Sequence, residues 1–178
     1  MAKNSSETDP VILGLGSNRS WNSMDSYAIL DKAIEELGKI LSELKCAPFY
    51  ETEPLPKSDQ NNFINTAVSG FFNGGPDEML DCIHMMEAMF GRDRSAEIRW
   101  GERSLDIDIL LFGRQIINSP RLTIPHPRLE ERRFALEPLI RLLPRACSPV
   151  TGISYQTICK ALPDQGVRLI NPCPLPKF

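Results

Sequence analysis

Three features that define other protein classes are missing from this chain of 178 residues. It has no apolar run long enough to span a membrane. The polar start "MAKNSSETDP" lacks the apolar segment of a secretory signal, so we expect residues 1–10 to form a flexible leader and residues 11–178 to form one cytoplasmic domain. The five cysteines form no CxxC pair and no Cys/His cluster, which predicts reduced thiols rather than a metal site.

Lysine is missing from residues 92–133, although this segment holds nine of the chain's thirteen arginines. The planar guanidinium of arginine favours bidentate recognition of oxyanions. A nucleic-acid-binding surface should be basic overall, but the pI is near 5.5 and residues 1–91 carry a net charge of −8. The segment therefore predicts a small phosphorylated ligand, with no nucleic-acid or membrane partner. Solvated surface charge is the alternative.

A dinucleotide-binding fingerprint is incomplete near the start of the chain. The glycines of "GLG" at residues 14–16 are followed by Ser17, Asn18 and Arg19, so the third glycine of the fingerprint is missing. We therefore interpret residues 11–18, "VILGLGSN", as a short buried strand that runs into a turn, and we assign no nucleotide-binding role to its glycines.

The remaining chain alternates between helical and strand patterns. Apolar residues at three- and four-residue steps predict an amphipathic helix over residues 23–44. Pro76 and Gly91 mark the two ends of a second helix. Further strands, a hairpin and two C-terminal helices are expected, in this order, over residues 46–55, 63–72, 104–112, 113–127, 129–144 and 154–162. This order predicts an α+β, ferredoxin-like βαββαβ sandwich, with an antiparallel sheet, both main helices on one face, and C-terminal additions.

Two carboxylates interrupt the apolar run "SLDIDILLF" at residues 104–112. In a strand, Asp106 and Asp108 share one face, while Leu105, Ile107 and Ile109 share the other. Carboxylates roughly 6.5 Å apart along a strand can jointly hold hard cations such as Mg²⁺, which take further oxygens from phosphate. Two metal ions roughly 3.5–4 Å apart would suit displacement at phosphorus. A neutralising ion pair with the nearby Arg103 is the alternative, because a buried carboxylate needs a positive partner.

Other side chains qualify as ligand contacts only together. The aromatic ring of Phe63 and the amide of Asn65 share one face of a predicted strand and suit a flat heteroaromatic ring. His126, close to several arginines, is able to bind a phosphate. His84 and Glu87 share a helix face. Each observation has a structural alternative. Phe63 would be an edge-strand residue and Asn65 a residue next to a turn, His126 would make a backbone contact in a turn, and His84 and Glu87 would be ordinary polar residues on the surface.

The segment "RWGERSLDIDIL" resembles the signature of the 6-hydroxymethyl-7,8-dihydropterin pyrophosphokinase family. The resemblance extends through "LGLGSN", "FYETEPL", "FINTAV", "EAMFGR" and "RLTIPHPRLEERRFALEPL", and so spans roughly residues 11–143. It implies a ferredoxin-like fold, ATP as co-substrate and two Mg²⁺ ions.

The resemblance also implies roles for individual residues. It places catalysis on Arg92, Arg103, Asp106 and Asp108, with both aspartates binding the Mg²⁺ ions. On the ATP side it implies His84, Glu87, Arg92, Trp100, Arg103, Ile109, Arg121, Thr123, His126 and Arg132. On the pterin side it implies Thr52, Glu53, Leu55, Phe63, Asn65, Trp100, Asp106 and Phe134.

The implied reaction is transfer of pyrophosphate from ATP to the pterin's hydroxymethyl group, with release of AMP, in folate biosynthesis. We expect a monomer whose loops over residues 54–62 and 91–103 become ordered when substrates bind. Two alternatives stay open. A different metal-dependent transferase would release pyrophosphate or ADP, and a non-catalytic nucleotide-binding module would show no turnover.

Overall fold

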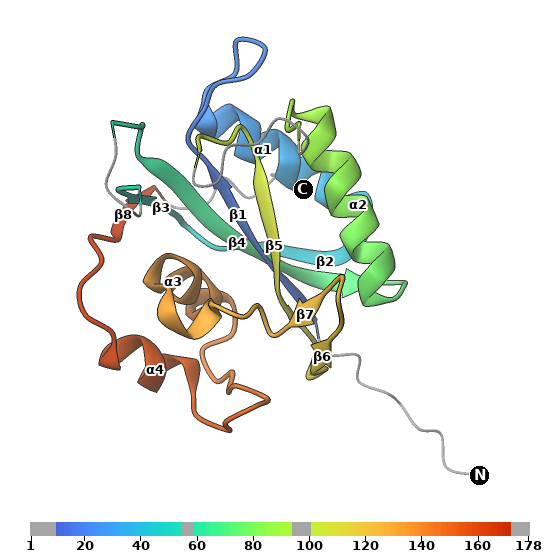
Figure 1. Cartoon of the computed structure of the whole chain (residues 1–178), viewed down its shortest axis with the longest axis vertical. Coiled ribbons are helices and arrows are strands. Elements are labelled where there is room, and N and C mark those ends of the chain that lie inside the picture. The colour runs from blue at the N-terminus through green and yellow to red at the C-terminus, as the bar shows by residue number, and fades with distance from the viewer. Residues whose placement is uncertain (1–9, 55–58, 94–100, 172–178) are drawn as a thin grey trace.

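A computed structural model describes residues 10–54, 59–93 and 101–171 of the chain. Its centre is a six-stranded sheet in the order β5-β1-β4-β3-β8, with β2 pairing with β4 beside this path (Figure 1). All the strand pairs in this sheet are antiparallel. The strands are β1 (Val11–Ser17), β2 (Leu41–Cys46), β3 (Phe49–Thr52), β4 (Phe63–Phe72), β5 (Asp106–Phe112) and β8 (Arg168–Asn171).

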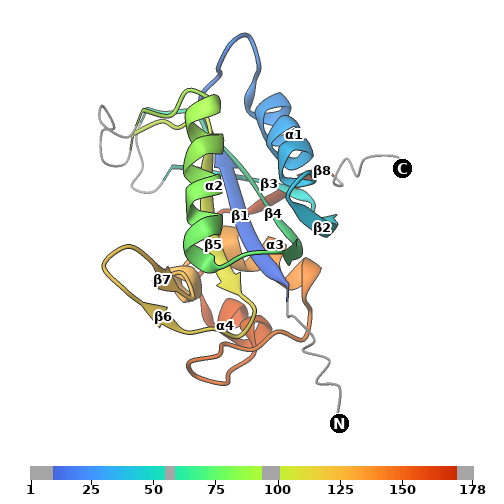
Figure 2. The same cartoon turned by 90° about the vertical axis from the view of Figure 1, so that its right-hand side faces the viewer.

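Helices cover both faces of this sheet. Helices α1 (Ser26–Leu37) and α2 (Pro76–Met89) lie on one face, and α3 (Arg133–Leu142) and α4 (Tyr155–Ala161) lie on the other (Figures 1 and 2). The alternation of side chains along β1 explains this arrangement. Its odd-numbered apolar residues Val11, Leu13 and Leu15 pack with α1 and α2, whereas Ile12 packs with α3 and α4. The predicted α+β class is confirmed, and α1 and α2 are the two main helices expected on one face.

The first helix is shorter than its apolar spacing predicted. Helix α1 ends at Leu37, and the chain turns through Gly38, whose N–H bonds to Ile34 O at 3.0 Å. Leu41 and Leu44, predicted as the last helical turns, belong to β2. The prediction over residues 38–44 is wrong because these leucines reach the same core from a strand as they would from a helix.

The C-terminal half contains two elements that bear on the site. The predicted helix over residues 129–144 is broken into a 3₁₀ turn, η1 (Leu129–Glu131), and α3. Between them Arg132 has the extended backbone angles φ −120° and ψ 102°. The predicted hairpin is present as β6 (Ile117–Asn118) and β7 (Thr123–Ile124), and β8 was not predicted. In the described part of the chain, no helix is long and apolar enough to cross a membrane.

Candidate functional site

A pocket of about 800 Å³ opens between the sheet and the start of α3. The alternation predicted along β5 creates its floor. Ile107 and Ile109 are buried under α2, while Asp106 and Asp108 line the pocket. Eleven residues predicted for the site line this pocket: Thr52, Glu53, Phe63, Asn65, Arg92, Arg103, Asp106, Asp108, His126, Arg132 and Phe134.

Two glycines of β1 keep the floor of the pocket open. Gly16 lies in register between Asp106 of β5 and Asn65 of β4, and Gly14 lies opposite Asp108. A Cβ atom at Gly16 would come within 3.2 Å of Asn65 Oδ1. The glycines that failed the dinucleotide fingerprint therefore have a different use, because they leave space above the centre of the sheet.

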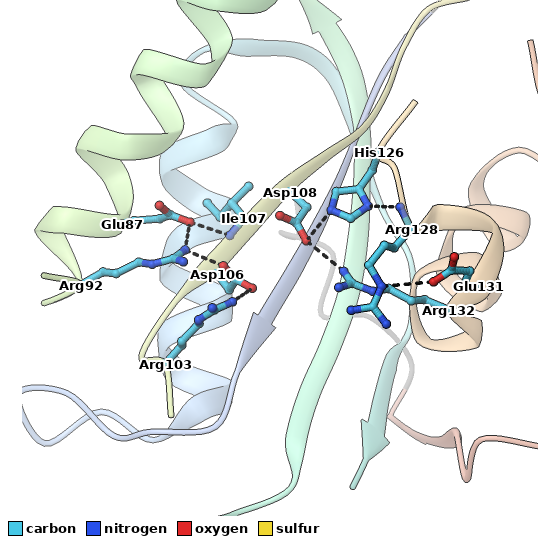
Figure 3. A network of polar contacts seen from close by, with 10 residues as sticks. All are labelled: Glu87, Arg92, Arg103, Asp106, Ile107, Asp108, His126, Arg128, Glu131 and Arg132. Atoms are coloured by element: carbon cyan, nitrogen blue, oxygen red, sulfur yellow. Dashed lines mark hydrogen bonds and ion pairs between the residues drawn. The ribbon is translucent and has the colours of Figure 1, made fainter. Parts of the chain in front are cut away.

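Asp106 is held by two arginines (Figure 3). Arg103 Nη1 donates to Asp106 Oδ2 at 2.7 Å, and Arg92 Nη1 bridges Asp106 and the buried Glu87. Glu87 also accepts a hydrogen bond from Ile107 N at 2.9 Å, which ties α2 to β5. The ion pair with Arg103, one of the two alternatives drawn from the sequence, is thus present. Arg92 forms a second ion pair with Asp106.

Asp108, two residues further along the same face of β5, has more distant partners (Figure 3). His126 Nε2 lies 3.7 Å and Arg132 Nη1 lies 3.8 Å from Asp108 Oδ2. His126 Nδ1 accepts a hydrogen bond from Arg128 N at 3.1 Å, so a neutral imidazole carries its proton on Nε2 and points it toward Asp108. Burial and then the charge of Arg132 lower the pKa of His126 to about 4, which keeps the ring neutral near pH 7.

The charge of Asp108 is only partly neutralised by its neighbours. Burial and the neighbouring Asp106 raise the pKa of Asp108 to about 7, against the opposing pull of Arg132. In the described residues no group of three His, Cys, Asp or Glu side chains could hold a metal ion. Mg²⁺ does not need such a group, since it is usually bound by one or two carboxylates, waters and substrate phosphates. Asp106 and Asp108 fit this role.

The other end of the pocket is aromatic. Asn65 is buried on β4, and its Nδ2 donates to Thr52 Oγ1 at 2.9 Å. Phe63 enters from the start of the same strand and Phe134 from the first turn of α3. The guanidinium of Arg132 lies 5.5 Å from the centre of the Phe134 ring. The aromatic end and the cationic end therefore meet at Arg132.

Two predicted site residues, Leu55 and Trp100, lie outside the described residues. Of the predicted residues that the structure describes, five do not line the pocket. Arg121 is bound to Asp81 of α2 and lies 3.6 Å from Asp77. The side chain of Ile109 points into the core under α2. Glu87 acts on the pocket through Arg92, while Thr123 lies on β7 and His84 on α2.

One residue that the sequence did not single out positions Arg103. The side chain of Asn18 is buried, with 1% of its surface exposed. Its Oδ1 accepts from Arg103 N at 2.8 Å, and its own N–H donates to Arg103 O at 2.9 Å. This pairing joins the end of β1 to the chain just before β5. The feature of the sequence that could have indicated this role is an amide side chain directly after the predicted strand, in "LGSN".

Comparison with known proteins gives relatives over most of the chain. A pyrophosphokinase of Pseudomonas aeruginosa named for 2-amino-4-hydroxy-6-hydroxymethyldihydropteridine is 36% identical over 157 residues, which cover 88% of this chain and 94% of the relative. The mitochondrial folate synthesis bifunctional protein of Arabidopsis thaliana is 40% identical over 148 residues, covering 83% of this chain and 26% of the relative. This chain thus spans about a quarter of the length of the plant bifunctional relatives.

A solved structure and a family model agree with these relatives. The crystal structure of wild-type Plasmodium falciparum HPPK-DHPS superposes with a TM-score of 0.65 at 16% identity, over 86% of this chain and 44% of that chain, and so shares the fold. The model of the 7,8-dihydro-6-hydroxymethylpterin-pyrophosphokinase family matches residues 12–144, which include all but the first residue of β1, and the whole of β5 and α3. The chain therefore belongs to the 7,8-dihydro-6-hydroxymethylpterin-pyrophosphokinase (HPPK) family.

Proposed function

We propose that this chain transfers the pyrophosphoryl group of ATP to 6-hydroxymethyl-7,8-dihydropterin, as a step of folate biosynthesis. The hydroxymethyl oxygen attacks the β-phosphorus, the bond from that phosphorus to the oxygen shared with the α-phosphate breaks, and AMP leaves. The hydroxyl proton passes to water. One observation carries the proposal: a single pocket joins the Asp106/Asp108 face of β5 to an aromatic end at Phe63 and Phe134.

The charged end of the pocket suits a triphosphate. Arg92, Arg103 and Arg132 bring three guanidinium groups to its lining, and neutral His126 adds an Nε2–H donor. Catalysis would depend on positioning and on neutralising the charge that develops on the phosphates. Asp106 and Asp108 would hold two Mg²⁺ ions, a source of the remaining positive charge that the phosphates need.

The aromatic end suits the flat pterin ring. Phe63 and Phe134 offer aromatic faces, and Asn65 and Thr52 offer polar edges for the ring's nitrogen and oxygen atoms. Gly16 leaves the floor between them open. This end, rather than the paired carboxylates, favours the pyrophosphokinase over another metal-dependent transferase.

The ferredoxin-like arrangement of the sheet is part of the same proposal. The segment from β1 to β5 has the element order and neighbouring strands of a ferredoxin-like βαββαβ unit, with β2 and β3 sharing the place of one edge strand. We treat residues 11–178 as one domain. The monomeric state and the cytoplasmic location stay predictions.

Product analysis with ATP, Mg²⁺ and 6-hydroxymethyl-7,8-dihydropterin tests the activity. We expect AMP only when all three are present. ADP or pyrophosphate would indicate another transferase. Nucleotide binding that is independent of Mg²⁺, with no turnover, would favour the binding module, in which Asp106 keeps its ion pairs with Arg92 and Arg103.

The same assay tests the role of Asp108. The variant Asp108→Ala should lower the rate of AMP formation by about a hundredfold or more, because it removes a charge that would hold the metal against the phosphates. Circular dichroism should show an intact fold. Glu35→Ala, which removes an exposed carboxylate bound to Lys32 on α1, is the matched control and should leave the rate unchanged. Near-normal activity of Asp108→Ala would contradict the metal assignment.

A further inference from the structure

The loop that follows α4 returns to the pocket. Gln165 in this loop lines the pocket together with Arg132. Its Nε2 donates to Glu131 O at 2.9 Å, and its Oε1 accepts from Arg133 N at 2.9 Å. A side chain from the C-terminal segment therefore binds the main chain on both sides of Arg132.

The helix end at this point needs such a partner. Arg132 is the N-cap residue of α3, and its side chain makes no capping hydrogen bond. The N–H of Arg133, the first residue of α3, has no acceptor within the helix. Gln165 supplies that acceptor from more than thirty residues away in the sequence. It also binds the last carbonyl of η1, at Glu131, and so fixes the break between the two helices.

Other contacts hold the loop itself in place. Arg133 Nη1 donates to Leu162 O at 3.2 Å, and Arg133 Nη2 lies 3.0 Å from Glu137 Oε1. Next to Gln165, Gly166 has a φ of 65° and its N–H donates to Asp164 Oδ1 at 2.9 Å. The loop thus has a defined turn, anchored to the first turn of α3.

We propose that Gln165 is a positioning residue that acts through Arg132. Gln165 fixes the peptide groups before and after Arg132. It thereby holds the guanidinium of Arg132 3.8 Å from Asp108 and above the Phe134 ring. The inference rests on the proposed function. It gives the C-terminal segment, which lies beyond the part matched by the family model, a role in the reaction.

A double-mutant cycle tests this inference. Gln165→Met keeps the length of the side chain and removes both hydrogen bonds. We expect it to lower kcat/KM for ATP by about ten- to a hundredfold, because a small misplacement of a charged group costs that much. In an Arg132→Ala background the same change should have almost no further effect, which a merely structural role would not produce.

The controls separate the possible failures. Gln156→Met makes the same change at an exposed position of α4 and should leave kcat/KM unchanged. If Gln165→Met does not fold, Gln165→Glu keeps the acceptor for Arg133 N–H but loses the donor to Glu131 O, and it enters the cycle instead. Unchanged kcat/KM, or an equal loss with and without Arg132, would overturn the inference. A wild-type chain that forms no AMP would instead refute the proposed function.

Discussion

Asp106 and Asp108 stand two residues apart on β5, yet their charges are met differently. Asp106 contacts Arg92 and Arg103 directly, whereas the guanidinium of Arg132 and the neutral ring of His126 lie 3.8 Å and 3.7 Å from Asp108. A carboxylate that lacks a close cation, next to another carboxylate, is held partly protonated near pH 7. Ionising Asp108 therefore costs free energy, and a cation bound to its carboxylate would offset that cost.

The pH dependence of stability exposes this cost. Because burial and Asp106 raise the pKa of Asp108 to about 7 from 3.8, the folded chain keeps a proton between about pH 4 and pH 7 that the unfolded chain releases. This group therefore lowers the free energy of unfolding as pH rises through that window. His126, with its pKa lowered to about 4 from 6.5, has the opposite effect over part of the range.

Comparison with a variant isolates the contribution of Asp108. In EDTA, Asp108→Asn should melt at a higher temperature than the wild type at pH 8, and the difference should shrink toward pH 5. Thermal melting followed by circular dichroism at both pH values measures it. A difference that is the same at pH 5 and pH 8 would contradict the raised pKa of Asp108.

Asn18 gives a second prediction for a single residue. Asn18→Ala should lower the free energy of unfolding by about 1–3 kcal/mol, since it removes a buried amide and leaves the part-buried N–H of Arg103 without its acceptor. Urea denaturation measures the loss. Asn118→Ala, on the exposed hairpin strand β6, should change stability by less than about 0.5 kcal/mol. Equal effects of the two substitutions would count against the bridge between β1 and β5.

The end of α2 shows how an element delivers a side chain to the pocket. Gly91 follows the helix with a φ of 80°, and the chain there passes so close to Trp21 that a Cβ atom would overlap the indole ring. Arg92 comes next and turns back to bind Glu87 of the same helix. The glycine at this position therefore sets the direction in which Arg92 leaves α2.

Two glycine substitutions separate backbone strain from overlap. Gly152→Ala, at a φ of 73° with nothing within 4 Å of the new methyl group, should cost about 1–2 kcal/mol from the left-handed backbone alone. Gly91→Ala should cost more, and it should also weaken ATP binding because Arg92 is displaced. Urea denaturation and calorimetric titration with ATP and Mg²⁺ measure the two effects. Equal losses of stability would show that Trp21 yields without cost.

Local sequence patterns predicted some elements and missed others. Strict alternation along β5 correctly placed Asp106 and Asp108 on the face opposite Ile107, because both faces of that strand are packed. The strand β8, "RLIN", escaped prediction because it is short and, among the described strands, stands last in the order of the sheet, paired with β3. The contacts of Gln165 escaped for a related reason: its partners are main-chain atoms, which leave no trace in residue types.

At the scale of the whole molecule, the pocket lies between the sheet and the layer of α3 and α4, which share one hydrophobic core. Its floor belongs to the sheet, and one wall belongs to α3, which packs with α4. A ligand in the pocket contacts both layers and so stabilises the complete fold. The ion pair of Asp106 with Arg103 was one of the alternatives that the sequence offered, whereas the pair with Arg92 and the meeting of these layers depend on tertiary packing.

Ligand binding should therefore raise the stability of the whole chain. An unreactive analogue, α,β-methylene-ATP, supplied with Mg²⁺ at a hundred times its dissociation constant, should add about 2.7 kcal/mol to the free energy of unfolding. EDTA should remove most of this gain. Thermal shift assays with and without EDTA measure the difference. A full shift in EDTA would mean that the nucleotide binds without the metal ions assigned to Asp106 and Asp108.

The pairing of β1 with β5 under the pocket has a consequence for the synthesis of the chain. Gly16 emerges from the ribosome early, but its partner Asp106 follows only after most of the other strands have been made. Gln165, which fixes the last wall, emerges later still. A nascent chain therefore carries an unpaired edge on β1, beside the glycines, until β5 arrives. Translation pauses between residues 72 and 106 would prolong the time in which that edge can pair with a wrong partner.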